Sequence, residues 1–497
     1  MNVNYIVNHD YHCMINCIKN KKCYSLRYLI IIVMKKNILI VISSDEYINN
    51  YVTTKSFSEI EKKYNCSYLI SKKVNRLNLI SKYFKIKTYS FDEDLKNRHI
   101  NFMNLLCFKY KKKSSSFYLR LKKFEHLYNV QFKRITSSHK LGKKIRANIF
   151  FWIKKKLLFI FKTIVCSNLI FPFYSSKKIS ELNIDIEFEK KFLSFSPDLA
   201  LFPSSAYDPE GFDIIRICKK MNIPSIFLVD NWDNLSSKTI LWQRPSVIGV
   251  WGQQSLNHAV NIQGFKKNQV NIIGTPRFNH YYKLRNKNLK SYFDGDYVLF
   301  LGSTLPFDEA SVLRKLNKII DKKSNIFKNL KIIYRPHPFR QGNDTIIGEN
   351  LKNVIIDPQI LESYKSLKKN ILPNLNYFPS LIKNAKFVIG GLTSMIIETL
   401  IFRKKYIALV HSEKNNISSP HNVYKNYIHF SELKYCKEIS FCNNLDKLEE
   451  IFTHTWLNSK TFDKMKLDLS TNFFCYSDNK DYSHRLKNLC VNTLSKN

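Results

Sequence analysis

The feature that most constrains this fold is a strand–turn–helix–strand pattern between Lys331 and Val410. It begins with KIIYRPHPFRQG, in which a β-branched and aromatic run ends in Arg335 and His337. After a spacer, the strand pattern AKFVIGG leads through the turn LTS into an apolar helix with one acid, Glu398, and the strand pattern YIALV follows. Short apolar strands that alternate with helices predict βαβ units and a parallel sheet.

Ligands of such sheets bind beyond the carboxyl ends of the strands. Proline on both sides of His337 fixes the backbone there, and Arg335 can form charge-assisted bonds to a phosphate. Thr393 or Ser394 can cap the following helix and leave amide hydrogens facing outward, where an anion is favoured. Gly391, after a second glycine, permits close approach of the backbone. The pattern predicts a phosphorylated or nucleotide-linked ligand; the alternative is a turn in which His337 caps a carbonyl.

The alternation of strands and helices occurs in two series. The first starts at Met34 and contains the strand patterns NILIVI, LALF and SIFLV, and the second starts with the strand pattern YVLFLGS. The fold class we expect is therefore α/β, with two tandem Rossmann-like domains and a cleft between them. We expect an extension over residues 1–33 that is disordered or not native, domains over 34–285 and 295–450, and a helical tail over 451–497.

Two further loops carry candidate site residues. Ser303 follows the first strand of the second series, where the turn LGS either lies over a diphosphate or is an ordinary βα turn. The loop DNWDNLSSK follows a buried strand and contains Asp230 and Asp233, either of which is a candidate catalytic base. Asp45 and Asp208 lie in similar loops and compete for that role. The alternative for DNWDNLSSK is a structural turn rich in Asn and Asp.

The chain has 80 Lys and Arg residues against 39 Asp and Glu residues, a net charge of +41. One reading is an anionic partner: a membrane surface, a nucleic acid or an acidic substrate. The other is a coding bias, because Lys, Asn, Ile, Tyr and Phe are all abundant and Gly and Pro are sparse. The 11 cysteines are scattered without a CxxC motif, which indicates reduced thiols. The His9–Cys23 cluster matches no zinc spacing that we recognise.

Apolar runs elsewhere are too short or too interrupted to predict a membrane-spanning helix. The longest, Leu157–Phe173, contains Lys162 and follows three lysines. We expect it to be a buried helix; the alternative is an interfacial helix on an anionic inner leaflet. Residues 57–150 are rich in Lys and weakly patterned, with helices expected near Phe57–Tyr64 and Phe117–Tyr128.

Taken together, these motifs resemble the GT-B glycosyltransferases of bacterial surface-polysaccharide synthesis, best over Pro197–Val410. The second domain is similar to that of HP-motif capsule transferases and teichoic acid glycerophosphotransferases. The resemblance implies an acceptor domain followed by a nucleotide-sugar domain, with no bound metal and no cofactor beyond the nucleotide-sugar co-substrate. It also implies that Arg335 and His337 face the donor phosphates, that Thr393 and Ser394 meet the phosphate, and that Glu398 meets the ribose or base.

The leading hypothesis is transfer of a sugar from a nucleotide-sugar to a glycan or lipid-linked acceptor, in the cytoplasm or at the inner face of the membrane. His337, Asp230 and Asp233 are the candidate catalytic residues. Alternatives are a CDP-glycerol-type polyol-phosphate transferase, a sugar-nucleotide epimerase and, from another class, a basic nucleic-acid-binding protein. We expect no nucleic acid partner, because we recognise no RNA- or DNA-binding module in the sequence.

Overall fold

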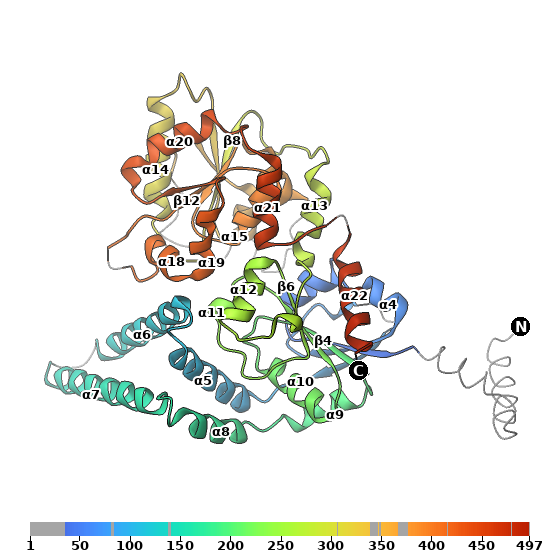
Figure 1. The fold of residues 1–497 in the computed structure, drawn as a ribbon. Coiled ribbons are helices and arrows are strands. Elements are labelled where there is room, and N and C mark those ends of the chain that lie inside the picture. The colour runs from blue at the N-terminus through green and yellow to red at the C-terminus, as the bar shows by residue number, and fades with distance from the viewer. Residues whose placement is uncertain are drawn as a thin grey trace, which may run out of the picture.

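The computed structural model describes residues 35–80, 84–137, 141–305, 307–337, 346, 349–365, 376–414, 416–478 and 480–496. This part of the chain forms two α/β domains, each built around its own parallel sheet (Figure 1). The expected class of two tandem Rossmann-like domains is confirmed. The 1–33 extension and the His9–Cys23 cluster lie outside the described residues.

The first sheet has seven parallel strands in the order β3-β2-β1-β4-β5-β6-β7. Its strands are β1 (Asn37–Ile42), β2 (Asn65–Ser71), β3 (Lys85–Tyr89), β4 (Leu199–Ser204), β5 (Ser225–Val229), β6 (Val247–Val250) and β7 (Val270–Ile272). The helices between and after these strands are α3 (Asp45–Tyr47), η1 (Ile48–Val52), α4 (Ser58–Lys63), η2 (Leu77–Leu79), α10 (Pro209–Lys220), α11 (Asn234–Ser237), α12 (Gln253–Asn261), η3 (Lys267–Gln269), η4 (Pro276–Phe278) and α13 (Asn279–Arg285).

The second sheet has six parallel strands in the order β10-β9-β8-β11-β12-β13. They are β8 (Tyr297–Leu301), β9 (Lys331–Arg335), β10 (Val354–Ile356), β11 (Val388–Gly390), β12 (Tyr406–Leu409) and β13 (Ile439–Cys442). The helices are α14 (Glu309–Lys322), α15 (Pro358–Lys365), α16 (Tyr377–Asn384), α17 (Met395–Ile401), α18 (Pro420–Asn426), α19 (Ile428–Ser431), η5 (Glu432–Tyr435), η6 (Leu445–Lys447) and α20 (Leu448–Leu457).

Both sheets reverse their direction of winding at one point, between β1 and β4 and between β8 and β11. In doubly wound sheets such a switch point leaves a crevice beyond the carboxyl ends of the strands, where ligands bind. The central strands β1, β4, β5, β8 and β12 are buried almost throughout, since helices cover both faces of the sheets. This is why those strands read as continuous apolar runs in the sequence.

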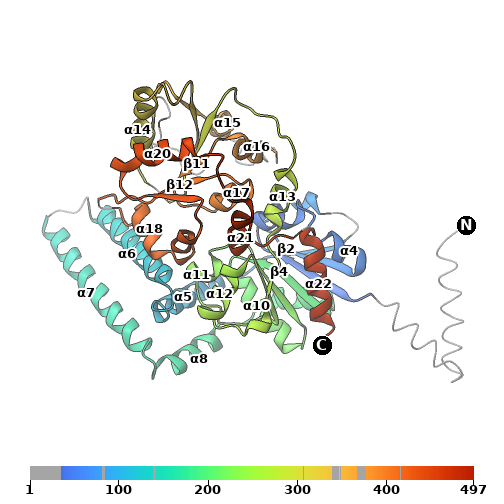
Figure 2. The same cartoon turned by 45° about the horizontal axis from the view of Figure 1, so that its top comes forward.

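Five helices are inserted between β3 and β4. They are α5 (Glu93–Lys109), α6 (Ser115–Thr136), α7 (Leu141–Val165), α8 (Phe171–Glu181) and α9 (Ile186–Leu193). In both views α6, α7 and α8 extend to one side of the two sheet domains, with α7 outermost (Figures 1 and 2). Among the described helices, none combines the length and the apolar composition that crossing a bilayer requires.

The carboxyl-terminal segment returns to the first domain. α21 (Lys464–Phe474) packs against α12 and α17, and α22 (Tyr482–Leu494) packs against α4. In both views α22 lies beside the first sheet, far from α20 (Figures 1 and 2). Residues of α22 share one apolar cluster with β1 and β2, so the last helix completes the core of the first domain.

The helices expected near Phe57–Tyr64 and Phe117–Tyr128 are present as α4 and α6, but two strands were not expected and the expectation for Leu157–Phe173 is wrong. Residues 57–150 contain β2 and β3 in addition to helices; β2 pairs with β1 and β3 with β2. The run Leu157–Phe173 is not a buried helix, because Leu157, Phe161 and Phe173 are 60%, 50% and 78% exposed. The apolar character of that run is therefore not explained by the core.

Candidate functional site

Three loops of the second domain meet beyond the carboxyl ends of β8, β9 and β11. The Gly302 amide donates to the Arg335 carbonyl over 2.9 Å, and a Cβ on Gly302 would lie 2.8 Å from the His337 nitrogen. A Cβ on Gly391 would lie 2.9 Å from the Cβ of Ser303. Only glycine allows this approach, so the sequence-predicted residues Ser303, Arg335, His337 and Gly391 do come together at the switch point.

The Ser303 side chain is already used within the protein. Its hydroxyl donates to the Leu392 carbonyl over 3.3 Å, its amide donates to Glu309 over 3.0 Å, and the residue is 2% exposed. The Tyr334 hydroxyl donates to the same Glu309 carboxylate over 2.6 Å. A ligand that used the Ser303 hydroxyl would have to replace the bond to Leu392.

Arg335 is held rigidly at the end of β9. Its guanidinium forms an ion pair with Asp357 and donates to Gln359 over 3.0 Å. The Tyr377 hydroxyl donates to Asp357 over 2.6 Å, and the Arg335 cation lies 5.1 Å from the centre of the Phe378 ring. This arrangement fixes the guanidinium plane, as bidentate recognition of a phosphate requires.

Thr393, Ser394 and Glu398 follow β11, as the sequence predicts, and differ in accessibility. Thr393 and Ser394 are half-buried, and Ser394 caps α17 without a side-chain bond. Glu398 is 1% exposed and accepts a 2.6 Å bond from Arg277 Nη2, which comes from η4 in the first domain. Sequence reasoning missed Arg277, because only the folded chain brings η4 to α17.

Asp230 is one of the first-domain carboxyls whose pKa is raised toward neutral pH. It follows β5, is 4% exposed and accepts a 3.0 Å bond from Asn50 Nδ2. Burial raises its pKa to about 7, with a further contribution from Glu46, against the opposing effects of Asn50 and Arg277. A carboxyl that titrates near neutral pH can both take up and release a proton there.

Asp208 lies close to Asp230 at the first switch point. It accepts from the Ser204 hydroxyl over 2.7 Å, from the Ser205 amide over 2.8 Å and from the Tyr47 hydroxyl. Its charge is one of the influences that raise the pKa of Asp230. The fourth candidate base, Asp45, accepts two 3.0 Å bonds from Asn75, which follows β2.

Asp233 is committed to the interior of its loop. It accepts from the Ser237 hydroxyl over 2.6 Å and lies 3.5 Å from Lys238 Nζ. Burial alone would raise the pKa of its carboxyl, but Lys238 and Ser237 hold that pKa below the ordinary value. Asp233 therefore stays ionised and holds its own loop together, which favours the Asn- and Asp-rich turn for this loop.

Arg277 connects the carboxyl ends of the two sheets. It bonds to Glu398 on one side, and its charge acts on Asp230 on the other. The Tyr281 hydroxyl also bonds to Glu398 and lies within the electrostatic influence of Arg335. We call this set of residues, from Asp230 to Arg335, the polar path. Hydrogen bonds join Arg277, Glu398 and Tyr281, and electrostatic influence extends from them to Asp230 and to Arg335.

No cluster of three or more His, Cys, Asp or Glu side chains suited to a metal ion occurs within the described ranges. The arrangement offers instead a buried carboxyl near its neutral point and several cationic or amide donors. Such a set suits proton transfer beside an anionic group.

No protein-family model matches this chain, and no curated protein sequence matches it. Several solved structures have a similar backbone fold. The UDP-GlcNAc 2-epimerase from Methanocaldococcus jannaschii has 13% identity and a TM-score of 0.48, covering 92% of this chain and 99% of that one. MnaA of S. aureus, solved with UDP, has 10% identity, a TM-score of 0.46 and coverages of 93% and 97%. MurG from Acinetobacter baumannii has 8% identity, a TM-score of 0.43 and coverages of 93% and 100%.

Proposed function

We propose that this chain is a nucleotide-sugar-dependent glycosyltransferase of the GT-B type. The observation that carries the proposal is the polar path between the two sheets, which begins at Asp230 and ends at Arg335. A base poised near pH 7 on one domain and a fixed guanidinium on the other are the two groups that glycosyl transfer needs.

In this proposal the second domain holds the donor. Arg335, His337 and the amides after Gly391 meet the diphosphate, and Glu398 meets the ribose. Because Glu398 is paired with Arg277 in the structure, donor binding exchanges that partner for the ribose hydroxyls. Arg277 then becomes a further cation for the diphosphate.

The proposed chemical step uses no metal ion, and each bond and proton in it is accounted for. The acceptor hydroxyl gives its proton to Asp230, and its oxygen forms a bond to the anomeric carbon of the donor sugar. The bond from that carbon to the diphosphate breaks, and the nucleoside diphosphate leaves with the electron pair. Arg335 and the neighbouring donors stabilise the charge that develops on the departing oxygen.

A nucleotide-sugar epimerase is the second candidate, and the proximity of two first-domain carboxyls favours it. The two carboxyls follow neighbouring strands, and the charge of Asp208 is one of the influences that raise the pKa of Asp230. Two such groups can remove and return protons on one bound sugar. An epimerase needs no acceptor, and this difference separates the two candidates.

The test uses the full chain with CMP, CDP, UDP, GDP and their sugar conjugates. A ligand at a hundredfold its Kd adds about 2.7 kcal/mol to the free energy of unfolding, visible as a rise in melting temperature. We expect one nucleotide to stabilise the protein and His337→Ala to lose that effect. His454→Ala, on the exposed surface of α20, is the matched control.

Product analysis then separates the reactions. Nucleotide release that requires an added glycan or lipid-linked acceptor supports the transferase, and an isomerised nucleotide-sugar without acceptor supports the epimerase. Transfer of a sugar phosphate or a polyol phosphate to the acceptor identifies a phosphotransferase. Stabilisation by DNA or RNA alone, lost in salt, contradicts all three.

A further inference from the structure

The outermost inserted helix, α7, exposes an apolar face along its length. Five isoleucines recur at spacings of four and seven residues and therefore share one side of the helix. They are 45–55% exposed: Ile145, Ile149, Ile153, Ile160 and Ile164. Trp152 and Phe150 beside them are 61% and 68% exposed. An apolar surface of this extent on a folded protein marks an interaction site.

The opposite side of α7 is fixed to the rest of the insertion. The Phe151 ring stacks 3.8 Å from the Phe132 ring of α6, and Lys155 forms a 2.6 Å ion pair with Glu125. At the end of α7, Lys109 of α5 donates to the Cys166 carbonyl over 2.9 Å. The isoleucine face is thus the side of α7 that these contacts leave uncovered, and α7 itself lies at the outer edge of the molecule (Figures 1 and 2).

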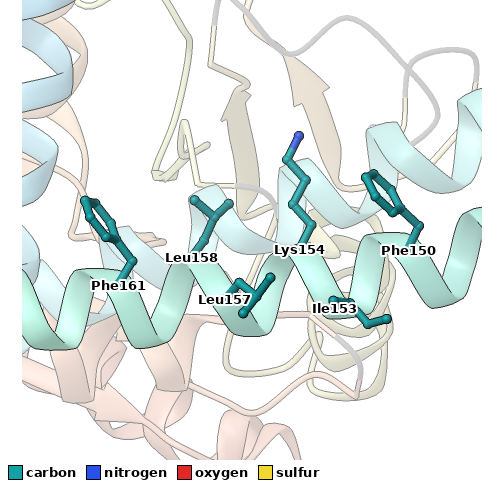
Figure 3. A pocket seen from close by; sticks show the side chains of 6 residues that line it. All are labelled: Phe150, Ile153, Lys154, Leu157, Leu158 and Phe161. Atoms are coloured by element: carbon teal, nitrogen blue, oxygen red, sulfur yellow. The ribbon is translucent and has the colours of Figure 1, made fainter.

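A shallow apolar hollow of about 390 Å³ lies along the same helix (Figure 3). It is lined by Phe150, Ile153, Lys154, Leu157, Leu158 and Phe161. The Lys154 side chain rises beside the rings and places the only charge of the lining at its edge. A long alkyl stem that carries a cation suits the boundary between an apolar layer and its charged surface.

The charge around this face is of one sign. α7 has seven cationic residues and no acidic one, and α6 has five cationic residues and one acidic one. Two copies of α7 would repel each other, which disfavours self-association through this face. A partner that matches both the apolar face and the positive charge of α7 is anionic at its surface and apolar beneath that surface.

We propose that α7 lies in the plane of a bilayer surface rich in anionic lipids. The five isoleucines and Trp152 enter the boundary between headgroups and acyl chains, and the flanking lysines meet the lipid phosphates. This binding requires neither a nucleotide nor an acceptor, so it is independent of the proposed function.

The insertion also connects this face to the candidate site. The hydroxyl of Ser114, the cap of α6, donates to the Ser236 carbonyl in the Asp230 loop over 2.6 Å. The Ser115 hydroxyl donates to the Asn426 carbonyl of the second domain over 2.6 Å. A membrane-bound α7 would hold both domains at a fixed distance from the lipid surface. This membrane-bound orientation would turn the candidate site toward a lipid-linked acceptor, an inference that rests on the proposed function.

The test is sedimentation of the full chain with vesicles of phosphatidylcholine alone or with about 30% phosphatidylglycerol. We expect binding to the anionic vesicles, and a loss of about fivefold in affinity for each cation removed by Lys154→Gln and Lys156→Gln. Ile149→Ser/Ile153→Ser/Ile160→Ser should reduce binding more than tenfold. The matched control is Met465→Ser/Leu469→Ser, because these α21 residues are 73% and 66% exposed.

Trp152 gives a local readout of insertion. All five tryptophans lie in the described part of the chain. Of these five, Trp152 is the only one whose side chain is exposed. A blue shift of tryptophan fluorescence on adding anionic vesicles, absent in Trp152→Phe, supports the proposal. Equal binding to neutral and anionic vesicles, or unchanged binding of the triple serine variant, overturns it. A dimer that the serine variant dissociates, without vesicle binding, also overturns it.

The two proposals fail separately. If only the membrane proposal is wrong, the triple serine variant and the wild type transfer sugar to a soluble acceptor equally and neither binds vesicles. If only the proposed function is wrong, vesicle binding persists and no nucleotide-sugar is consumed.

Discussion

Single carboxyl groups in the first domain differ in protonation because their partners differ. Burial raises the pKa of Asp230, Glu210 and Asp213 to about 7, whereas cationic and hydroxyl partners hold the pKa of Asp233 below its ordinary value. Asp213 lies in a buried group with His99 and Arg216, away from the junction of the two sheets. Only Asp230 combines a raised pKa with a place on the polar path.

Replacement of Asp230 by Asn should remove activity and change how stability depends on pH. The raised pKa means that folding favours the protonated carboxyl, so its contribution to stability falls as pH rises from about 3.8 to about 7. Asp230→Asn should therefore match the wild type near pH 4 and exceed its stability at pH 8, by about 4 kcal/mol. Denaturant unfolding at both pH values measures this.

The control is Asp446→Asn, whose side chain is 86% exposed and should show no such trend. Wild-type activity should rise between pH 6 and 8 as Asp230 loses its proton. Full activity of Asp230→Asn would assign the base to another group, with Asp208 the next candidate.

The ion pair of Arg277 and Glu398 supports a second prediction. Arg277→Met leaves the buried Glu398 carboxylate without its cation and should lower the free energy of unfolding by about 3 kcal/mol. Arg277→Met/Glu398→Met should recover most of that loss. Lys322→Met breaks an exposed pair with Glu449 and should cost below about 1 kcal/mol. Additive losses in the double variant would show that the two side chains are not coupled.

Sequence reasoning placed the candidate residues at strand ends and missed their partners. Arg335, His337 and Glu398 stand next to strand patterns, so their place at strand ends follows from the local sequence. The partner of Glu398 lies 121 positions away, and that of Arg335 lies 22 positions away, in the next strand–helix unit. No local spacing encodes such contacts.

At the scale of elements, burial of a strand on both faces decides how clearly the sequence predicts that strand. β1 and β5 are NILIVI and SIFLV, which predict strands without ambiguity. β3, at the edge of the sheet, is KIKTY, half polar and half-buried, and β2 begins with polar residues. These two strands were missed for that reason. α7 was misjudged for the opposite reason, since its apolar residues face outward.

The last helix offers a prediction at this scale. Leu486 of α22 is fully buried among residues of β1 and β2. Leu486→Ala should cost about 3 kcal/mol through lost burial and a residual cavity. Leu469→Ala on the exposed side of α21 should change stability by less than about 0.5 kcal/mol. Equal effects of the two changes, measured by denaturant unfolding, would mean that α22 is not part of the core.

For the whole molecule, a buried polar network adds to the contact between the domains. Gln254 and His258 of α12 meet the Glu432 carboxylate at 2.6 Å and 3.3 Å. Trp232 of the first domain packs against His429, whose pKa burial lowers to about 3, so that its imidazole stays neutral. The domains are thus joined by groups that water would compete for if they separated.

Glu432→Ala should loosen this junction. It removes the acceptor of Gln254 and the partner of His258, so the radius of gyration in solution scattering should increase. Addition of the nucleotide that stabilises the wild type should reverse the increase. Glu449→Ala, at an exposed pair of α20, is the control. An unchanged radius in Glu432→Ala would mean that apolar contacts alone hold the domains.

The return of α22 to the first domain also affects how the chain is made. The apolar layer over β1 stays open until residues near Cys490 have been synthesised, although the rest of that domain ends near Arg285. At typical synthesis rates of 5–20 residues per second, this leaves roughly 10–40 s in which apolar surface of β1 and α4 is uncovered on the ribosome. Chaperone capture of the nascent chain should therefore be concentrated in that interval.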